Sequence, residues 1–136
     1  MIDFKNILYP IDLDAVSASS LTKALEFARL LQCPIHILYV NDVEAGYRHP
    51  ADHEDTVALR VRELVSESLL ENLDIIFSVS KGNIADEIAR YAKANRIDLI
   101  ITGHRHRGSL YAAMFDSTDV HLIDKVSLPV LIFPED

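Results

Sequence analysis

The stretch NILYPI, residues 6–11, is a short apolar run of branched and aromatic residues that ends in the acidic turn Asp12–Asp14. Such a run predicts a buried β-strand. Pro10 has no N–H group to donate to a sheet, so the strand should end near it. Residues 17–31 then place leucine and alanine at helical spacing, with Ser17 as the expected N-cap. The chain therefore begins with a strand that is followed by an amphipathic helix.

The same alternation continues along the rest of the chain. Further apolar runs predict strands at residues 35–40, 75–79, 99–102 and 129–133. Helical periodicity predicts the intervening helices over residues 56–70, after the cap Asn83, and after the cap Ser117, with Val120, Ile123 and Val126 facing inward. Strands that alternate with helices and read as continuous apolar runs indicate a parallel sheet covered on both faces.

We therefore expect one α/β domain over residues 1–136, built as a three-layer α/β/α sandwich around a five-stranded parallel sheet. Right-handed crossovers would wind the sheet as two halves from the first strand, in the order 3-2-1-4-5. Ligands of such sheets bind at the carboxyl ends of the strands, where the order reverses. The first and fourth strands flank that point, so a ligand site should lie near Asp12 and Gly103.

Composition excludes several classes of protein. The 136 residues are 49% hydrophobic, which is enough for a core, and 21 acidic against 13 basic residues give a formal charge of -8. This charge opposes attraction to nucleic acids and anionic lipids. No window approaches the ~20 apolar residues of a membrane span, and no leader precedes the first strand. Cys33 is the only cysteine, which rules out an internal disulfide and fits a reducing compartment, so we expect a cytoplasmic protein.

The segment that follows the fourth strand, GHRHRG at residues 103–108, has three interpretations. As a phosphate turn it offers Gly103, the amides of a following helix, and the cations Arg105 and Arg107, although compact phosphate loops use more than one glycine. As a metal site it would use His104 and His106, completed by His49, His53 or Asp12.

The two arginines raise the local potential against a dication, and no known ligand spacing is present, so we expect no metal. As a catalytic loop it lacks a nucleophile elbow, so we expect no catalytic residue. The Asp12 and Asp14 pair also suggests a phospho-receiver domain. That fold needs an aspartate after the third strand, where this chain has Lys81, and a lysine after the fifth, where it has Pro134.

Five segments together resemble the universal stress protein family. They are KNILYPID (5–12), ILYVND (37–42), KGNIADEIARYA (81–92), DLIITG (98–103) and LPVLIF (128–133). The resemblance implies an adenine nucleotide alpha hydrolase-like fold of the kind predicted above. It also implies a homodimer through the last strand, Val130, Leu131, Ile132 and Phe133. A bare apolar edge strand is an association hazard, so a symmetric partner there also makes physical sense.

Nucleotide-binding members of that family wrap ATP phosphates with a GxxG turn, nine further residues, and then Gly-Ser or Gly-Thr. In this chain Gly103 and Ser117 match that pattern, whereas His106 replaces the second glycine and Asp116 the third. The resemblance also implies that Pro10, Asp12 and Val40 occupy the positions that hold adenine and ribose. The base half of the pocket is thus retained while the phosphate half is changed.

A carboxylate beside a triphosphate meets like charge, worth about 4 kcal/mol at 4 Å for an effective dielectric of 20. Arg105 and Arg107 could offset part of this repulsion. The GHRH sequence (103–106) resembles the A-like branch of the family, which implies that ATP is not bound tightly. We therefore expect a non-catalytic stress-response or regulatory homodimer with a degenerate nucleotide pocket, and an unidentified protein partner is compatible with that role.

Two alternatives remain open from the residues. One is an ATP or adenine-nucleotide sensor, or a slow ATPase, that uses the retained turn from Gly103 to Ser117. The other is a protein that holds adenosine or its monophosphate without the triphosphate wrap.

Overall fold

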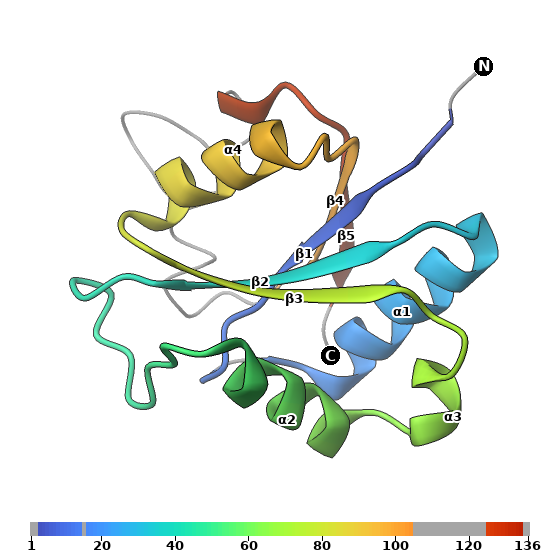
Figure 1. Cartoon of the computed structure of the whole chain (residues 1–136), viewed down its shortest axis with the longest axis horizontal. Coiled ribbons are helices and arrows are strands. Elements are labelled where there is room, and N and C mark those ends of the chain that lie inside the picture. Colours follow the sequence, from blue (N-terminus) through green and yellow to red (C-terminus); the bar gives the residue numbers. More distant parts are fainter. Residues whose placement is uncertain (1–2, 15, 105–124, 135–136) are drawn as a thin grey trace.

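The computed structural model describes residues 3–14, 16–104 and 125–134 (Figure 1). Within these residues the chain forms one parallel sheet in the order β3-β2-β1-β4-β5, which confirms the predicted fold class and strand order. The strands are β1 (Ile7–Pro10), β2 (Ile35–Asn41), β3 (Ile75–Lys81), β4 (Leu99–His104) and β5 (Val130–Pro134). Pro10 is the last residue of β1, as its missing N–H group predicts.

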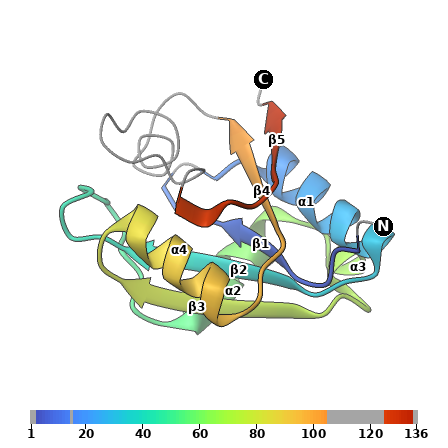
Figure 2. The same cartoon turned by 90° about the horizontal axis from the view of Figure 1, so that it is seen from above.

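Side chains of the central strands alternate between the two faces of the sheet, as period-two geometry requires. On one face, Ile7, Ile37 and Tyr39 belong to a cluster that also holds the buried residues of α1 and α2, which we call the α1-side cluster. On the other face, Leu8 and Val40 belong to the α4-side cluster, whose further members are Leu38, Ile84, Ile88, Ala92, Ile97 and Ile100. Figure 1 shows the sheet between these two layers of helices, and Figure 2 looks down on it from the α4 side.

Helix α1 (Ala18–Leu31) begins at the predicted cap, because the Ser17 hydroxyl oxygen accepts a hydrogen bond from the Ser20 amide at 3.3 Å. Its buried face consists of Ser20, Leu21, Ala24, Leu25 and Ala28. The helix ends at Gln32, whose backbone is left-handed with φ 54°. Cys33 follows and is buried.

The single helix predicted over residues 56–70 is wrong, because this segment forms two helices, α2 (Glu54–Leu64) and α3 (Glu67–Leu70). Val65 has extended backbone angles and its side chain enters the α1-side cluster. The Arg29 guanidinium of α1 donates hydrogen bonds to the carbonyl oxygens of Leu69 at 2.6 Å and Glu71 at 2.8 Å. The hydrophobic periodicity correctly indicated which side chains of this segment pack inward. It does not reveal the break between α2 and α3, which the Arg29 side chain of α1 stabilises.

Helix α4 (Ile84–Ala94) covers the opposite face of the sheet and begins at the predicted cap, where the Asn83 side chain accepts from the Asp86 amide at 3.1 Å. The predicted helix after Ser117, including Val120 and Ile123, lies outside the described residues. Val126 is described and packs against the α4-side cluster. None of the helices that the structure describes is long and apolar enough to span a bilayer.

A polar group is buried between the sheet and α4. His36 of β2 is 7% exposed, with Nδ1 2.7 Å from the Tyr91 hydroxyl and Nε2 3.3 Å from Asn6 Oδ1. The same Tyr91 hydroxyl lies 3.0 Å from Ser78 Oγ. Burial lowers the pKa of His36, since the charged imidazolium would lose its water. His36 is thus a packed histidine between β2 and α4.

Candidate functional site

The first and fourth strands diverge toward their carboxyl ends. The β1–β4 ladder has only two pairs, Ile7 with Leu99 and Leu8 with Ile100. On its other side β1 stays paired with β2 up to Pro10 opposite Leu38, and the Ile11 amide donates to the Leu38 carbonyl at 2.9 Å. On the far side of the gap, β4 stays paired with β5 as far as His104. The strand order reverses at this point, which is where sheets of this class hold their ligands. We call this place, at the carboxyl ends of β1 and β4, the crevice.

The β1–α1 turn places a carboxylate at this crevice. Asp12 is only 7% exposed, and its Oδ1 accepts a hydrogen bond from the Asp14 amide at 3.1 Å. This side-chain bond to the residue two positions ahead is an Asx turn, which explains locally why the acidic pair follows the strand. Pro10, directly before it, is also buried. A carboxylate in this position can accept hydrogen bonds from the hydroxyl groups of a ligand.

Val40 lies on the neighbouring strand β2, is 4% exposed, and belongs to the α4-side cluster. The next residue, Asn41, leaves the sheet and donates from Nδ2 to Asp52 Oδ1 at 2.6 Å. Lys81, which pairs with Asn41 at the end of β3, has its ammonium group 3.5 Å from the same Asp52 oxygen. These contacts hold both ends of the β2–α2 connection at the carboxyl edge of the sheet.

Gly103 lies near the end of β4 opposite Phe133, and the preceding Thr102 is 3% exposed. The structure thus brings Pro10, Asp12, Val40 and Gly103 to one edge of the sheet. The other predicted ligand residues, Arg105, His106, Arg107 and Ser117, lie outside the described residues, as does Asp116.

Sequence reasoning missed Tyr47, which lies in the β2–α2 connection, residues 42–53. Its ring packs on that of Tyr39, with centroids 5.4 Å apart at an interplanar angle of 47°. Burial, followed by the nearby Asp12 carboxylate, raises the pKa of Tyr47. Burial likewise raises the pKa of Tyr39 to about 12, although the Ala51 backbone lowers it in part. A single aromatic residue inside a polar loop was the available signal, but nothing in the sequence shows where it packs.

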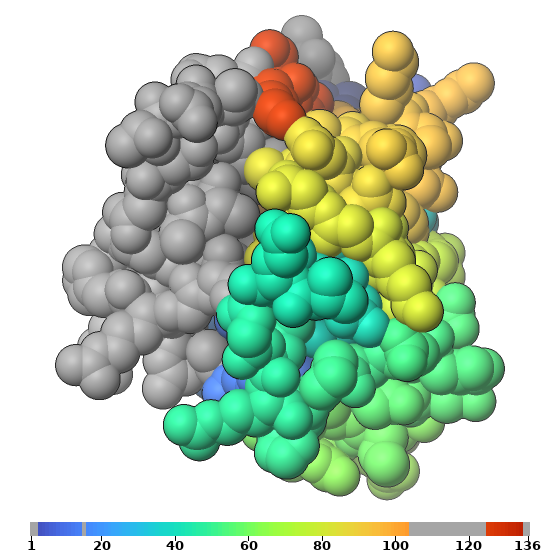
Figure 3. Space-filling model, turned by 90° about the vertical axis from the view of Figure 1, so that its left-hand side faces the viewer, coloured from blue at the N-terminus to red at the C-terminus, as the bar shows by residue number. Residues whose placement is uncertain are grey.

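Figure 3 views the carboxyl edge and shows residues of the β2–α2 connection beside a small visible part of the β1–α1 segment. The connection is tied to that segment by the Arg48 amide, which donates to Asp14 Oδ2 at 2.8 Å. The two segments are far apart in sequence, and this bond brings Tyr47 next to the acidic turn.

Two of the histidines considered for a metal site, His49 and His53, lie in the β2–α2 connection. His53 is the N-cap of α2, where its Nδ1 accepts from the Asp55 amide at 3.2 Å. His49 is exposed in the connection. Within residues 3–14, 16–104 and 125–134, no group of three or more histidine, cysteine, aspartate or glutamate residues is arranged to hold a metal ion.

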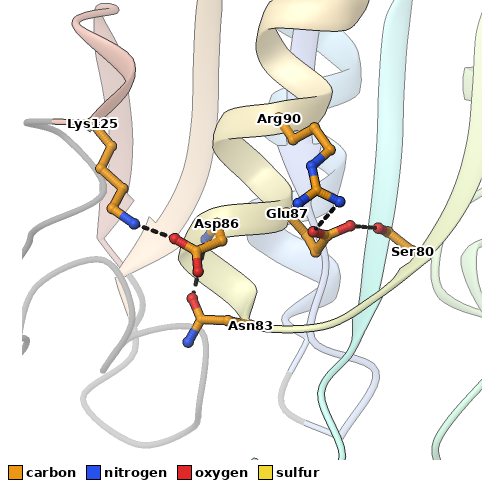
Figure 4. A network of polar contacts seen from close by, with 6 residues as sticks. All are labelled: Ser80, Asn83, Asp86, Glu87, Arg90 and Lys125. Carbon is orange, nitrogen blue, oxygen red and sulfur yellow. Dashed lines mark hydrogen bonds and ion pairs between the residues drawn. The ribbon is translucent and has the colours of Figure 1, made fainter.

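The β3–α4 turn forms a second polar corner of the same edge (Figure 4). Glu87, 8% exposed, accepts a hydrogen bond from Ser80 Oγ at 2.5 Å and pairs with Arg90 at 2.8 Å. Gly82 crosses the turn with φ 138°, and a Cβ there would lie 3.1 Å from Glu87 Cγ. Asp86 pairs with Lys125 across to the segment before β5. These contacts give the turn a structural role in fixing the start of α4.

A family model and a curated relative both indicate the same protein family. The model of the universal stress protein family matches residues 3–134. A universal stress protein of Methanocaldococcus jannaschii is 24% identical over 138 aligned residues, which cover 95% of this chain and 81% of that protein.

Solved structures agree with the fold. A universal stress protein in complex with cAMP superposes with a TM-score of 0.65 at 15% identity, covering 99% of this chain and 100% of that one. A universal stress protein from Archaeoglobus fulgidus in complex with dAMP superposes with a TM-score of 0.56 at 19% identity, covering 96% of this chain and 98% of that one.

Proposed function

The chain belongs to the universal stress protein family, and on that premise we propose that it is a non-catalytic regulatory homodimer of the cytoplasm whose nucleotide pocket is degenerate. Its activity would be to bind a protein partner, with no dependence on ATP. The observation that carries this proposal is a contrast between structure and sequence. Pro10, Asp12 and Val40 are buried at the carboxyl edge, whereas the sequence has His106 and Asp116 where the family's phosphate motif has glycines.

The charge argument supports independence from ATP. Phosphate groups need closely approaching amides or cations, and a glycine allows that approach because it has no side chain. The sequence has Asp116, a negative charge, where the family's phosphate motif has a glycine, and the Asp12 carboxylate lies at the same carboxyl edge. The arginines at 105 and 107 supply charge, but on long side chains whose ordering costs entropy.

Calorimetry with ATP and magnesium tests this part of the proposal. We expect no saturable binding by the parent protein below about 1 mM, or about -4 kcal/mol. The double variant His106→Gly, Asp116→Gly restores the glycine pattern and should gain binding. A micromolar dissociation constant for the parent, or stoichiometric nucleotide in the purified protein, would instead establish the ATP-sensor alternative. Hydrolysis assays on such a preparation would then decide whether it is a slow ATPase.

We propose that the homodimer forms through β5. This strand is at the edge of the described sheet, so one side of its backbone has no strand partner among the described residues. Leu131 and Phe133 pack toward the α1-side cluster, while Ile132 is 36% exposed. Because a second copy could extend the sheet and cover Ile132, this edge suits a symmetric contact.

Light scattering tests the dimer directly. The wild-type protein should have twice the monomer mass, and Ile132→Asp should be monomeric, because a charge would be buried in the contact. Leu30→Asp is the matched control, since it introduces the same charge on α1, where Leu30 is 75% exposed. A wild-type monomer at high concentration contradicts the proposal, as does a dimer that Ile132→Asp leaves intact.

A second candidate is favoured by the solved structures with cAMP and dAMP, both of which carry adenine and a single phosphate. An adenine nucleoside or monophosphate would need only the base and ribose side of the crevice, where Asp12 can accept hydrogen bonds from ribose. A thermal-shift series with adenosine, AMP and cAMP tests this candidate. Stabilisation by RT ln(1 + [L]/Kd) is expected for a true ligand. A melting temperature unchanged by all three compounds would dispose of it.

A further inference from the structure

We infer that Tyr47 controls access to the base side of this crevice. Its ring packs against the α4-side cluster, to which Val40 belongs, and the next residue is bonded to the acidic turn that holds Asp12, so an adenine compound would have to displace the ring. This inference rests on the second candidate function above, the binding of an adenine nucleoside or monophosphate. It assigns control of ligand access to a residue outside the five segments that carry the family resemblance.

The position of Tyr47 follows from its packing. Tyr47 contacts both the α1-side cluster and the α4-side cluster, which lie on opposite faces of the sheet. A side chain outside the sheet can reach both faces only at an edge. For Tyr47 that edge is the carboxyl end of β2, because its ring packs on Tyr39 and the connection leaves the strand after Asn41. Val40, between these two residues, points to the α4 side.

The β2–α2 connection is anchored so that the ring stays next to Asp12. The amide of Arg48, the next residue after Tyr47, donates to Asp14 Oδ2 at 2.8 Å. Asp14 in turn is bonded through its own amide to Asp12 Oδ1 at 3.1 Å. The chain of contacts from Tyr47 to Asp12 is therefore short. The raised pKa of Tyr47, with Asp12 as the first charged contributor, agrees with this proximity.

The ring is held in a way that allows displacement. Tyr47 is only half-buried and belongs to no helix or strand. The Arg48–Asp14 bond is exposed, so water can replace it at small cost. Loops that are held by exposed hydrogen bonds open more readily than the strands and helices of the core. Adenosine would bind only those molecules in which the Tyr47 ring has moved aside. If they are a small fraction of the protein, the apparent affinity is lowered by that fraction, and removing the ring restores the full affinity.

Calorimetric titration with adenosine tests the inference. Adenosine is neutral, so altered charge near Asp14 does not confound the result. The variants are Tyr47→Ala, which removes the ring, Tyr47→Phe, which keeps it, and Asp14→Ala, which removes the anchor of Arg48. Val43→Ala is the matched control, because Val43 lies in the same connection and is 91% exposed. Circular dichroism and melting curves establish that each variant is folded.

We expect Tyr47→Ala to bind adenosine roughly tenfold more tightly than wild type, in proportion to the population it releases. Asp14→Ala should change affinity in the same direction by a smaller factor, and Tyr47→Phe and Val43→Ala should resemble wild type. Equal affinities of wild type and Tyr47→Ala overturn the inference while leaving adenosine binding in place. Weaker binding by Tyr47→Ala also overturns it and makes the ring a supporting wall. No binding by either protein overturns the inference together with the adenine candidate, whereas the regulatory dimer is judged separately by light scattering.

Discussion

The Tyr91 hydroxyl connects α4 to two strands, and its removal should have a measurable effect on stability. It lies 2.7 Å from His36 Nδ1 and 3.0 Å from Ser78 Oγ, so Tyr91→Phe removes two hydrogen bonds without changing the shape of the ring. Each bond contributes about 0.5–1.5 kcal/mol net, and His36, 7% exposed, would be left with an unpaired ring nitrogen. We therefore expect the free energy of unfolding to fall by about 2 kcal/mol.

Urea denaturation measures this change, with an unaltered m-value showing that the folded state stays compact. Tyr47→Phe is the matched control, because none of the hydrogen bonds of the described residues uses the Tyr47 hydroxyl. A double-mutant cycle with Ser78→Ala tests whether the two side chains interact. If they belong to one hydrogen-bond network, their effects on the free energy of unfolding should not be additive. A Tyr91→Phe cost below about 0.5 kcal/mol, or strict additivity with Ser78→Ala, would refute the network.

Three further predictions concern other parts of the molecule. The pKa of His36 is lowered in the folded protein, so as the pH falls below about 6.5 the unfolded chain takes up a proton at this residue first. The free energy of unfolding should therefore decline in that range. Denaturation curves of His36→Gln should show a smaller decline. Gly82→Ala should lower the free energy of unfolding in urea by about 1–2 kcal/mol, because Gly82 has a φ of 138° and a Cβ there would lie close to Glu87. The loss should exceed that of Gly46→Ala, where a Cβ would meet nothing within 4 Å. Burial raises the pKa of the Cys33 thiol, so a thiol reagent should modify the native protein far more slowly than the protein in urea, and equal rates would contradict this packing.

The sequence by itself determined the architecture. Apolar runs such as residues 6–11 and 35–40 predict buried strands because only a strand covered on both faces can be apolar at every position. The caps Ser17 and Asn83 were also readable, since each bonds to an amide three residues ahead. Chirality of the crossovers then leaves few strand orders. These features depend on local chemistry and on rules shared by all chains, so one sequence is sufficient to predict them.

Only the tertiary structure decided the features that depend on contacts between distant segments. The break between α2 and α3 involves the Arg29 side chain of α1, and no periodicity within residues 54–70 reports it. The β1–β4 ladder ends after two pairs, which is a matter of sheet twist and register. Tyr47 reached the crevice through a bond from Arg48 to Asp14. A loop has no repeating geometry, so its side chains are placed by whichever distant groups they meet, and those groups are known only once the chain has folded.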